Sequence, residues 1–438
     1  YLDGAYGWDQ FDENKVSSRV MDYVAGNLSE TGENSVFRTK LCEASLLEYM
    51  FATDNDGTGM LRQASAYMKR HLPEDVAKKM YQQYQDGKKA EADGKTEYSV
   101  EDADQAIINA KKEKEQADQN DKEGAPQEEA GEKNIQDNEN NHAQDAEDSK
   151  KESPIQIVLQ LKQNALLGMT VSDMSSLSAK AVEAKDMVSN RQCETGRYDM
   201  KKAEKMNVSD RVMVLEYIGK HFSDYTEPGK GDLTYEMEYI LCGKDTDKKN
   251  LESSIERLMR MREAANVAHI IADREKLNQT LMIATSLAGF SGNPAVVKIV
   301  QIGVVAAWAY VESILDLRTL LSGGKISLIK SAAEWTTDLK KLGEIVTGEG
   351  KARECKNGLS YQAYIKQLLF AMKEKKMAYR MMDIMELAMQ KEQNGKNARM
   401  DHMIDNMICE LRFEAKPLFA KRSFYGDMEM GGYMFFKR

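Results

Sequence analysis

The sequence predicts an α+β fold that is predominantly helical, with a helical core and a small antiparallel sheet joining the N-terminal and C-terminal parts. Two observations predict it. Apolar residues recur at helical spacing through most of the chain after residue 154. By contrast, residues 234–241 and 409–416 alternate strictly between apolar and polar side chains, as half-buried strands do. A chain of 438 residues with 42% hydrophobic and 30% charged residues is typical of a globular protein.

The N-terminal part is expected to cover residues 1–109 and to combine helices with one strand. Apolar residues at helical spacing predict helices over 15–28 and 61–70. Between them, residues 39–53 contain enough Leu, Tyr, Met and Phe to form a buried strand. Pro73 disfavours helical backbone in the residue before it, so the second helix should end there.

Residues 110–153 differ sharply in composition from the rest of the chain. They contain no aromatic residue and almost no branched aliphatic residue. Such a segment cannot bury enough apolar surface to offset its conformational entropy, so we expect a disordered acidic insertion. It is either a solvated linker or an acidic tether for a basic partner. In residues 101–150, 16 acidic side chains outnumber 6 basic ones, which accounts for the net charge of −10 of the whole chain.

The third part, residues 154–438, is expected to be mainly helical and to form one module with residues 1–109. Its helices are predicted at 154–167, 212–222, 250–274, 277–288, 295–321, 326–346 and 361–390. Ser209 has the character of an N-cap for the second of these. The most apolar run, residues 299–311, is too short to span a bilayer unaided and indicates a buried helix. No segment of this sequence is therefore predicted to cross a membrane.

The first predicted strand of the third part lies at residues 234–241. Tyr235 and Tyr239 belong to its apolar face, and Glu236 and Glu238 belong to the face that we expect to meet water.

Two further strands are expected near the end of the chain. Residues 409–416 alternate in the same way, and residues 428–436 are the next candidate. A strand this late in the chain needs a partner, and the candidates are 39–53 and 234–241. The sheet would thus tie together the two ends of the chain, with the acidic insertion interrupting one module instead of separating two.

The sequence contains no recognisable catalytic or cofactor-binding motif. No HExxH, P-loop, GxGxxG, GxSxG or CxxC pattern occurs. The histidines are isolated, and most cysteines are interpreted as small buried apolar residues, with one disulfide between distant cysteines left open for an exported chain. The cysteines are Cys42, Cys193, Cys242, Cys355 and Cys409. We therefore expect no enzyme activity and no cofactor, and the absence of a basic field argues against nucleic acid as a partner.

The best metal candidate is the acidic turn DNDGTG. Asp54, Asp56 and Thr58 occupy the first, third and fifth positions of an EF-hand-like loop. The twelfth position should supply a bidentate glutamate, and here it is Ser65. The residues therefore indicate either a weak Ca²⁺ site or a turn stabilised by side-chain hydrogen bonds to the backbone.

A second acidic cluster follows the predicted strand at 234–241. Gly243 is expected to turn the chain, and Lys244 and two further lysines surround Asp245 and Asp247. The lysines oppose cation binding. The favoured interpretation is a helix start, with Asp245 or Asp247 accepting a backbone N–H as the N-cap.

Methionine is unusually abundant, with 27 residues. Met377, Met381, Met385 and Met389 recur at every fourth position and so share one helix face. Such a face is either a flexible core filler or an adaptable surface for a partner.

Several stretches together resemble a family of uncharacterised Gram-positive proteins. That family is encoded with Tad (Flp, type IVc) pilus genes and is loosely related to TadE-like pseudopilins. The stretches occur in the family's order: YLDGAYGWDQFD, LEYMFATDNDGTGMLRQASAYMKRH, SPIQIVLQLKQNALLGMTVSDMSSLSAK, LTYEMEYILCGKDTDKKNL, NPAVVKIVQIGVVAAWAYVESILDLRTLLSGGKISLIKSAAEW, GLSYQAYIKQLLF, YRMMDIMELAM and IDNMICELRFEA. The resemblance covers most of the chain outside the acidic insertion.

This resemblance implies an exported protein held at the membrane by an N-terminal pilin-like helix that is absent from this sequence, which begins at Tyr1. The expected location is the extracellular face of the cytoplasmic membrane or the cell surface, with other pilus or cell-envelope proteins as partners. The family has no established catalytic residues that could be assigned to this sequence. Its motifs resemble helix caps, strand edges and helix contacts.

Two further functions remain open from the sequence. One is a surface module that binds a protein or glycan through exposed tyrosines or the methionine face. The other is a hydrolase, which would need carboxylates or a Ser/His pair converging in a pocket.

Overall fold

The computed structural model describes residues 11–31, 37–72, 153–198, 206–288, 294–342, 350–392, 396–417 and 424–433, with the single residues 82, 109 and 112. The described residues fall into two compact units, each drawn from separate stretches of the chain. The first unit draws on 1–81, 179–250 and 369–438, and the second on 82–178 and 251–368. The predicted acidic insertion lies almost wholly outside the described residues, so it and the three-part division stay predictions.

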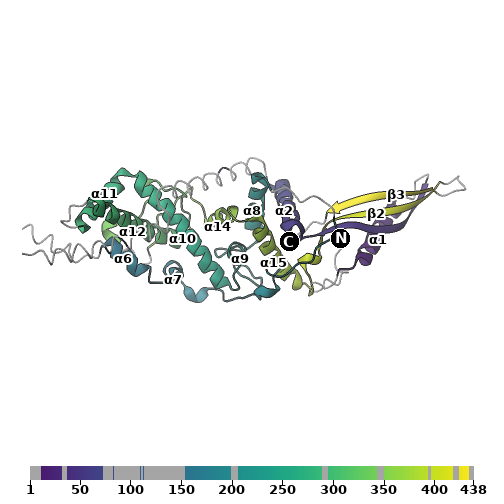
Figure 1. Ribbon diagram of the computed structural model, residues 1–438, viewed down its shortest axis with the longest axis horizontal. Helices are drawn as coiled ribbons and strands as arrows, with labels where there is room; N and C mark the ends of the chain where they lie inside the picture. Colours follow the sequence, from purple (N-terminus) through teal and green to yellow (C-terminus); the bar gives the residue numbers. More distant parts are fainter. Residues whose placement is uncertain are drawn as a thin grey trace, which may run out of the picture. The chain divides into compact units, whose positions relative to one another are not determined.

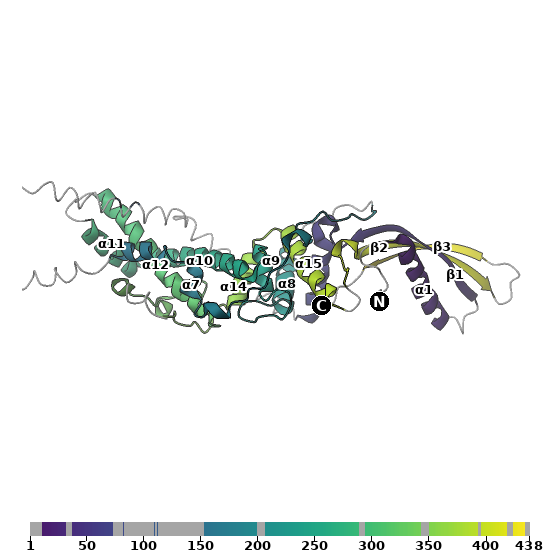
Figure 2. The same ribbon diagram turned by 90° about the horizontal axis from the view of Figure 1, so that it is seen from below.

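The first unit contains an antiparallel sheet made from the two ends of the chain. Its strands are β1 (Phe37–Phe51), β2 (Ile404–Pro417) and β3 (Phe424–Tyr433), in the order β1-β2-β3. The register pairs Phe37 with Pro417 and Phe51 with Ile404, with three irregularities along β1. Figures 1 and 2 show the strands side by side. The predicted α+β fold, with a small sheet joining the N-terminal and C-terminal parts, is confirmed.

Helix α1 (Glu13–Thr31) covers one face of this sheet (Figure 2). Its residues Val16 and Val20 are buried against Leu41, Phe51 and other apolar residues of β1 and β2. The apolar spacing that predicted a helix at 15–28 is therefore the spacing of the face that packs on the sheet.

Four further helices of the first unit pack on one another. They are α2 (Thr58–His71), α8 (Val208–His221), α9 (Glu236–Cys242) and α15 (Glu374–Gln390). Helix α2 packs on α8, and α15 packs on both α9 and α2. Helix α8 starts two residues earlier than expected because Asn207, and not Ser209, is its N-cap, accepting the N–H of Asp210.

The second unit is built mainly from helices in its described part, joined by loops and short 3₁₀ turns. It contains α6 (Pro154–Leu161), α7 (Leu166–Thr170), α11 (Arg274–Leu287), α12 (Pro294–Leu321) and most of α14 (Tyr361–Phe370). Helix α10 (Asp247–Ala272) begins in the first unit and continues into the second. Helices α11 and α12 lie side by side in both views (Figures 1 and 2).

Three helix predictions differ from the structure. The helix expected over 154–167 breaks at Lys162 into α6 and α7, and the helix expected over 361–390 breaks after Phe370 into α14 and α15. The helix expected over 326–346 is wrong in its described part. That stretch holds two short 3₁₀ turns, at Ala332–Glu334 and Leu339–Lys341, because its polar groups bond to α12 and to local caps instead of to a helical ladder.

Helix α12 is, within the described ranges, the one helix long and apolar enough to cross a membrane by length and composition. However, 61% of its most apolar window is buried inside the structure. The core helix of a globular unit passes the same test, so this is weak evidence for a span. The burial agrees with the interpretation of residues 299–311 as part of a buried helix, although α12 extends well beyond them at its C-terminal end.

Candidate functional site

The most distinctive line of the sequence, residues 234–247, folds into a short buried helix and not into a strand. All of α9 is buried, including Glu236 and Glu238. Glu236 accepts the backbone N–H of Ser223 at 3.0 Å, and Glu238 accepts that of Tyr225 at 2.9 Å. The predicted strand at 234–241 is therefore wrong: the two glutamates that suggested a wet face satisfy buried backbone donors instead of meeting water.

The acidic cluster after α9 is also used internally. Asp247, the first residue of α10, accepts the N–H groups of Thr234 at 2.9 Å and Tyr235 at 3.3 Å. The expected N-cap role of Asp245 or Asp247 is wrong, because Thr246 Oγ1 accepts the N–H of Lys249 at the helix start. Asp245 instead pairs with the Lys249 ammonium at 2.9 Å, and this hydrogen bond lowers the pKa of Asp245.

Gly243 ends α9 in the left-handed region, with φ of 64°, as the sequence suggested for a turn. The Arg380 guanidinium lies directly over this glycine and donates to the carbonyls of Ile240 at 3.0 Å and Leu241 at 2.8 Å. Lys244 follows with both its backbone N–H and C=O bonded to the Asn250 side chain. The contacts of Gly243 and Lys244 therefore fix the backbone between α9 and α10.

A first polar network anchors the loop around residues 187–194 to α15. Asp383 accepts the Tyr239 hydroxyl at 2.8 Å and also the Ser189 hydroxyl and N–H. Arg191 forms a bidentate pair with Glu386, at 2.5 and 2.7 Å, and reaches Asp401 at 2.6 Å. Bidentate Arg–carboxylate pairs are both strong and geometrically specific.

The pKa shifts of this first network follow from its burial and pairing. Burial raises the pKa of Asp383 and of Tyr239, whose hydroxyl therefore remains a donor near neutral pH. Burial alone would also raise the pKa of Asp401, but hydrogen bonds from Arg399 and Arg191 outweigh it and lower that pKa to about 2. The network is thus built around a carboxylate that stays charged.

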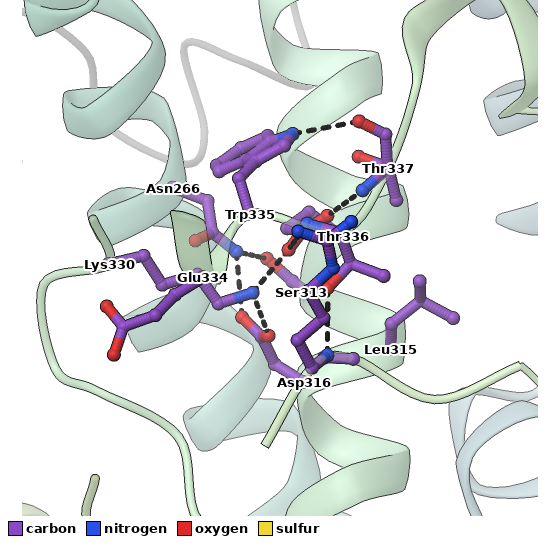
Figure 3. Close-up of polar contacts among 12 residues, drawn as sticks. Asn266, Ser313, Leu315, Asp316, Lys330, Glu334, Trp335, Thr336 and Thr337 are labelled. Atoms are coloured by element: carbon purple, nitrogen blue, oxygen red, sulfur yellow. Dashed lines mark hydrogen bonds and ion pairs between the residues drawn. The ribbon is translucent and has the colours of Figure 1, made fainter. Parts of the chain in front are cut away.

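A second polar network lies inside the second unit (Figure 3). Glu312 and Asp316 come from one face of α12, Arg262 comes from α10, and Lys330 comes from the loop that follows α12. All four side chains are almost completely buried. Because charged residues are rarely buried unless they are paired, this cluster is the most unusual chemical feature of the described second unit.

The four charged groups of the second network compensate one another. Lys330 Nζ contacts Glu312 Oε1 and lies 2.5 Å from Asp316 Oδ1. Arg262 reaches the other oxygen, Asp316 Oδ2, at 3.0 Å, and Asn266 donates to the same oxygen at 3.0 Å. Two positive and two negative groups are thus interleaved. Burying each ion costs several kcal/mol, so removing any one of them should be far more harmful than losing a surface pair.

The surrounding residues lock the second network in place. Glu312 accepts the backbone N–H groups of Thr336 at 3.1 Å and Thr337 at 2.9 Å. Arg262 donates to the carbonyls of Ser327 at 3.0 Å and Leu328 at 2.9 Å. The loop that carries Lys330 is therefore held at several points by side chains of the helices.

Aromatic rings enclose this network. The indole N–H groups of Trp308 and Trp335 both donate to Thr337, at 2.7 and 3.0 Å. The Trp335 ring lies 5.8 Å from Lys330 Nζ, and the two indoles meet edge to face at 5.5 Å. The amine is thus shielded from solvent by apolar surface.

A model of a family of unknown function, DUF5702, matches residues 144–415, more than half of the chain. The chain belongs to the DUF5702 family. No curated protein and no solved structure matches it. Both polar networks lie wholly within the DUF5702 match, whereas α1, β1 and α2 lie before it.

The acidic turn of this DUF5702 protein, which was the candidate Ca²⁺ site, directs its side chains to other partners. Asp54 accepts the N–H groups of Phe51 at 2.7 Å and Gly196 at 2.9 Å, and Asp56 pairs with a lysine of α15. Thr58 donates to a carbonyl of the turn. In the part of the chain that the structure describes, no group of three or more His, Cys, Asp or Glu residues is placed to hold a metal ion.

The methionine face is core. Met377 and Met381 are fully buried and Met385 is 7% exposed, so the hypothesis of a partner surface on this face is wrong. A small pocket beside Met381 and Met385 has a volume of about 20 Å³, far below the usual size of a ligand site. No disulfide joins any of the five cysteines, and Cys242, Cys355 and Cys409 are buried, as expected of small apolar residues.

The second network escaped the sequence analysis. Its visible signal was the pair Glu312 and Asp316, four positions apart in an otherwise apolar helix. Two carboxylates on the buried face of a core helix require buried cations, and this requirement could have directed attention to Lys330 and Arg262.

Proposed function

We propose that this DUF5702 protein is a non-enzymatic structural or assembly component of the bacterial cell envelope, associated with a Tad/Flp-type pilus system. In this proposal an N-terminal helix preceding Tyr1 anchors it, and the described units stand on the extracellular face of the cytoplasmic membrane or at the cell surface. Its partners are other pilus or cell-envelope proteins, and nucleic acid is not among them.

The observation that carries the proposal is the way the chain uses its buried charged groups. In both networks the carboxylates bond to arginine, lysine, hydroxyl or backbone donors of the same unit. Enzyme sites instead direct such groups into a cleft where a substrate binds. Carboxylates bonded within their own unit support a structural role, and the ordered blocks of resemblance to pilus-associated proteins point to the pilus system.

The sheet offers a second line of support. Strands β1 and β2 are long, at 15 and 14 residues, and they join the beginning of the described chain to its end. Helix α1, the first described helix after the proposed anchor, packs on one face of these strands and is thereby part of the folded unit. Tension on the N-terminal segment would act first on α1, which packs on the sheet.

Deleting the gene and scoring pilus assembly by electron microscopy tests the proposal. We expect loss or marked shortening of pili, with recovery when the complete coding sequence is supplied. Supplying only the chain that begins at Tyr1, behind a cleavable export signal, should give a released protein and no recovery. Normal pili in the deletion strain, or a protein found only in the cytosolic fraction, would refute the proposal.

A further inference from the structure

The amine of Lys330 and the carboxyl group of Asp316 meet in an unusual way. Nζ lies 2.5 Å from Oδ1, but this contact lacks the geometry of a hydrogen bond, and the amine donates its hydrogen bond to Glu312 Oε1. An amine and a carboxyl group are thus in contact outside hydrogen-bonding geometry, in a buried site. We propose that this cluster is a self-modification site, at which Lys330 Nζ and Asp316 Cγ condense into an intramolecular amide bond.

The fold supplies the proximity that such a reaction needs. Asp316 is fixed on α12, and the loop of Lys330 is fixed by the contacts of Arg262 with Ser327 and Leu328. Groups held in this way react as if one were present at about 10⁵–10⁸ M. The slow condensation of an amine with an acid thereby becomes an intramolecular step.

Glu312 is placed to carry the protons, since it contacts Lys330 Nζ and lies one helical turn from Asp316. It takes a proton from the ammonium, and the freed lone pair attacks Asp316 Cγ to form the new C–N bond. Glu312 then returns protons to Oδ1 as the Cγ–Oδ1 bond breaks. Two of the three ammonium hydrogens leave with Oδ1 as one water molecule, and the third remains on the amide nitrogen. No oxidant, reductant or cofactor is required.

The other oxygen of Asp316 is held by the groups that the attack would need. Arg262 and Asn266 donate to Oδ2, each at 3.0 Å (Figure 3 shows the Asn266 contact). Donors fixed at an oxygen on which negative charge develops stabilise the tetrahedral intermediate of acyl transfer. Their position on Oδ2 leaves Oδ1, the oxygen that faces the amine, as the one that departs.

Burial favours the product. Lys330 is 3% exposed and Asp316 is 0% exposed, so water that would hydrolyse the amide is excluded. Condensation removes one positive and one negative charge from the interior. Arg262 and Glu312 remain, so the buried charge stays balanced while two desolvated ions disappear. The inference concerns the chain itself and does not depend on the proposed pilus role.

Mass spectrometry of the intact, denatured full-length chain tests the proposal. We expect a mass lower by one water molecule than the mass calculated from the sequence. A tryptic map should then join peptide 299–318 to peptide 326–340, because trypsin does not cleave after an acylated lysine. A chain at its calculated mass, with free 299–318 and 326–330 peptides, would overturn the proposal, and this measurement needs no variant.

Three variants assign the roles. Lys330→Arg and Glu312→Gln should both restore the calculated mass, the first because it removes the nucleophile and the second because an amide side chain cannot carry the proton. Glu334→Gln is the matched control, since Glu334 caps Ser331 in the same loop without touching Asp316, and it should keep the cross-link. A Glu312→Gln chain that still lacks one water would overturn the proton-carrying role.

Discussion

The hydroxyl of Tyr239 donates to Asp383 across 2.8 Å and thereby joins α9 to α15 in the first unit. The same carboxylate accepts the hydroxyl and the N–H of Ser189, so one buried acid connects α15, the loop around residues 187–194 and the segment 234–247. Burial raises the pKa of both the phenol and the acid, which keeps the tyrosine a donor. The contact shows that Tyr239, in the segment 234–247, holds α9 against α15.

Tyr239→Phe tests whether the hydrogen bond from Tyr239 to Asp383 stabilises the fold. The substitution keeps the ring but leaves a buried Asp383 oxygen with fewer donors. We expect a loss of about 1–2 kcal/mol in the free energy of unfolding, because one hydrogen bond to a buried carboxyl group is lost while the Ser189 hydroxyl still bonds to the same oxygen. Urea denaturation followed by circular dichroism measures it. Tyr23→Phe is the control, because Tyr23 is 63% exposed; equal effects of the two substitutions would contradict the assignment.

Asp401 should make the protein sensitive to acid. Its folded pKa of about 2 lies below the ordinary value of 3.8, so its pairing with Arg191 and Arg399 stabilises the fold fully above pH 3.8. That contribution, about 2 kcal/mol, is lost as the pH falls toward 2. We expect Asp401→Asn to reduce stability at pH 7 and to flatten the dependence between pH 4 and 2.

Urea midpoints across this pH range check the Asp401 prediction. Asp22→Asn, which changes an exposed acid on α1, serves as the matched control. An unchanged slope in Asp401→Asn would show that the carboxylate does not act as the structure indicates.

Asp405 should behave in the opposite way. Burial raises its pKa to about 6, above the ordinary 3.8, although a hydrogen bond from Gln63 acts against this. The folded state therefore holds the proton more tightly than the unfolded state, and stability falls as the pH rises from 3.8 through 6. We expect Asp405→Asn to gain about 1–2 kcal/mol at pH 8 relative to the native chain, and little at pH 4.

Thermal unfolding at these two pH values decides the Asp405 prediction. A variant that is less stable than the native chain at pH 8 would show that the charged form of Asp405 is needed in the fold.

An alternating pattern predicts a strand correctly where the polar side chains face solvent. It predicts the wrong structure where the polar side chains form hydrogen bonds inside the protein. Residues 409–416 were predicted as a strand, and β2 confirms it. Residues 234–241 have the same alternation, but Glu236 and Glu238 bond to N–H groups 13 positions earlier in the chain. A pattern of polarity cannot distinguish water from a buried donor as the partner of a carboxylate.

The second network illustrates the same limit at longer range. Arg262 and Asp316 are 54 positions apart. The sequence around either residue does not indicate that the other is its partner. Only the fold brings them together, because α10 and α12 carry them and the loop of Lys330 closes over both. The helices themselves were predictable from apolar spacing, but the meeting of their charged groups was not.

Gly243→Ala tests the turn between α9 and α10. Gly243 has a φ of 64°, and a Cβ there would collide with the Arg380 guanidinium that caps α9. Alanine in this region costs about 1–2 kcal/mol for the backbone alone, and displacing Arg380 also leaves two buried carbonyls without donors. We expect a total loss of about 2–4 kcal/mol, read from urea denaturation. Gly168→Ala is the matched control, since Gly168 lies in α7 with open space around its Cα and alanine favours helix. That control should be neutral or slightly stabilising, and a Gly243→Ala chain as stable as the control would show that neither the backbone conformation nor the Arg380 cap matters to the fold.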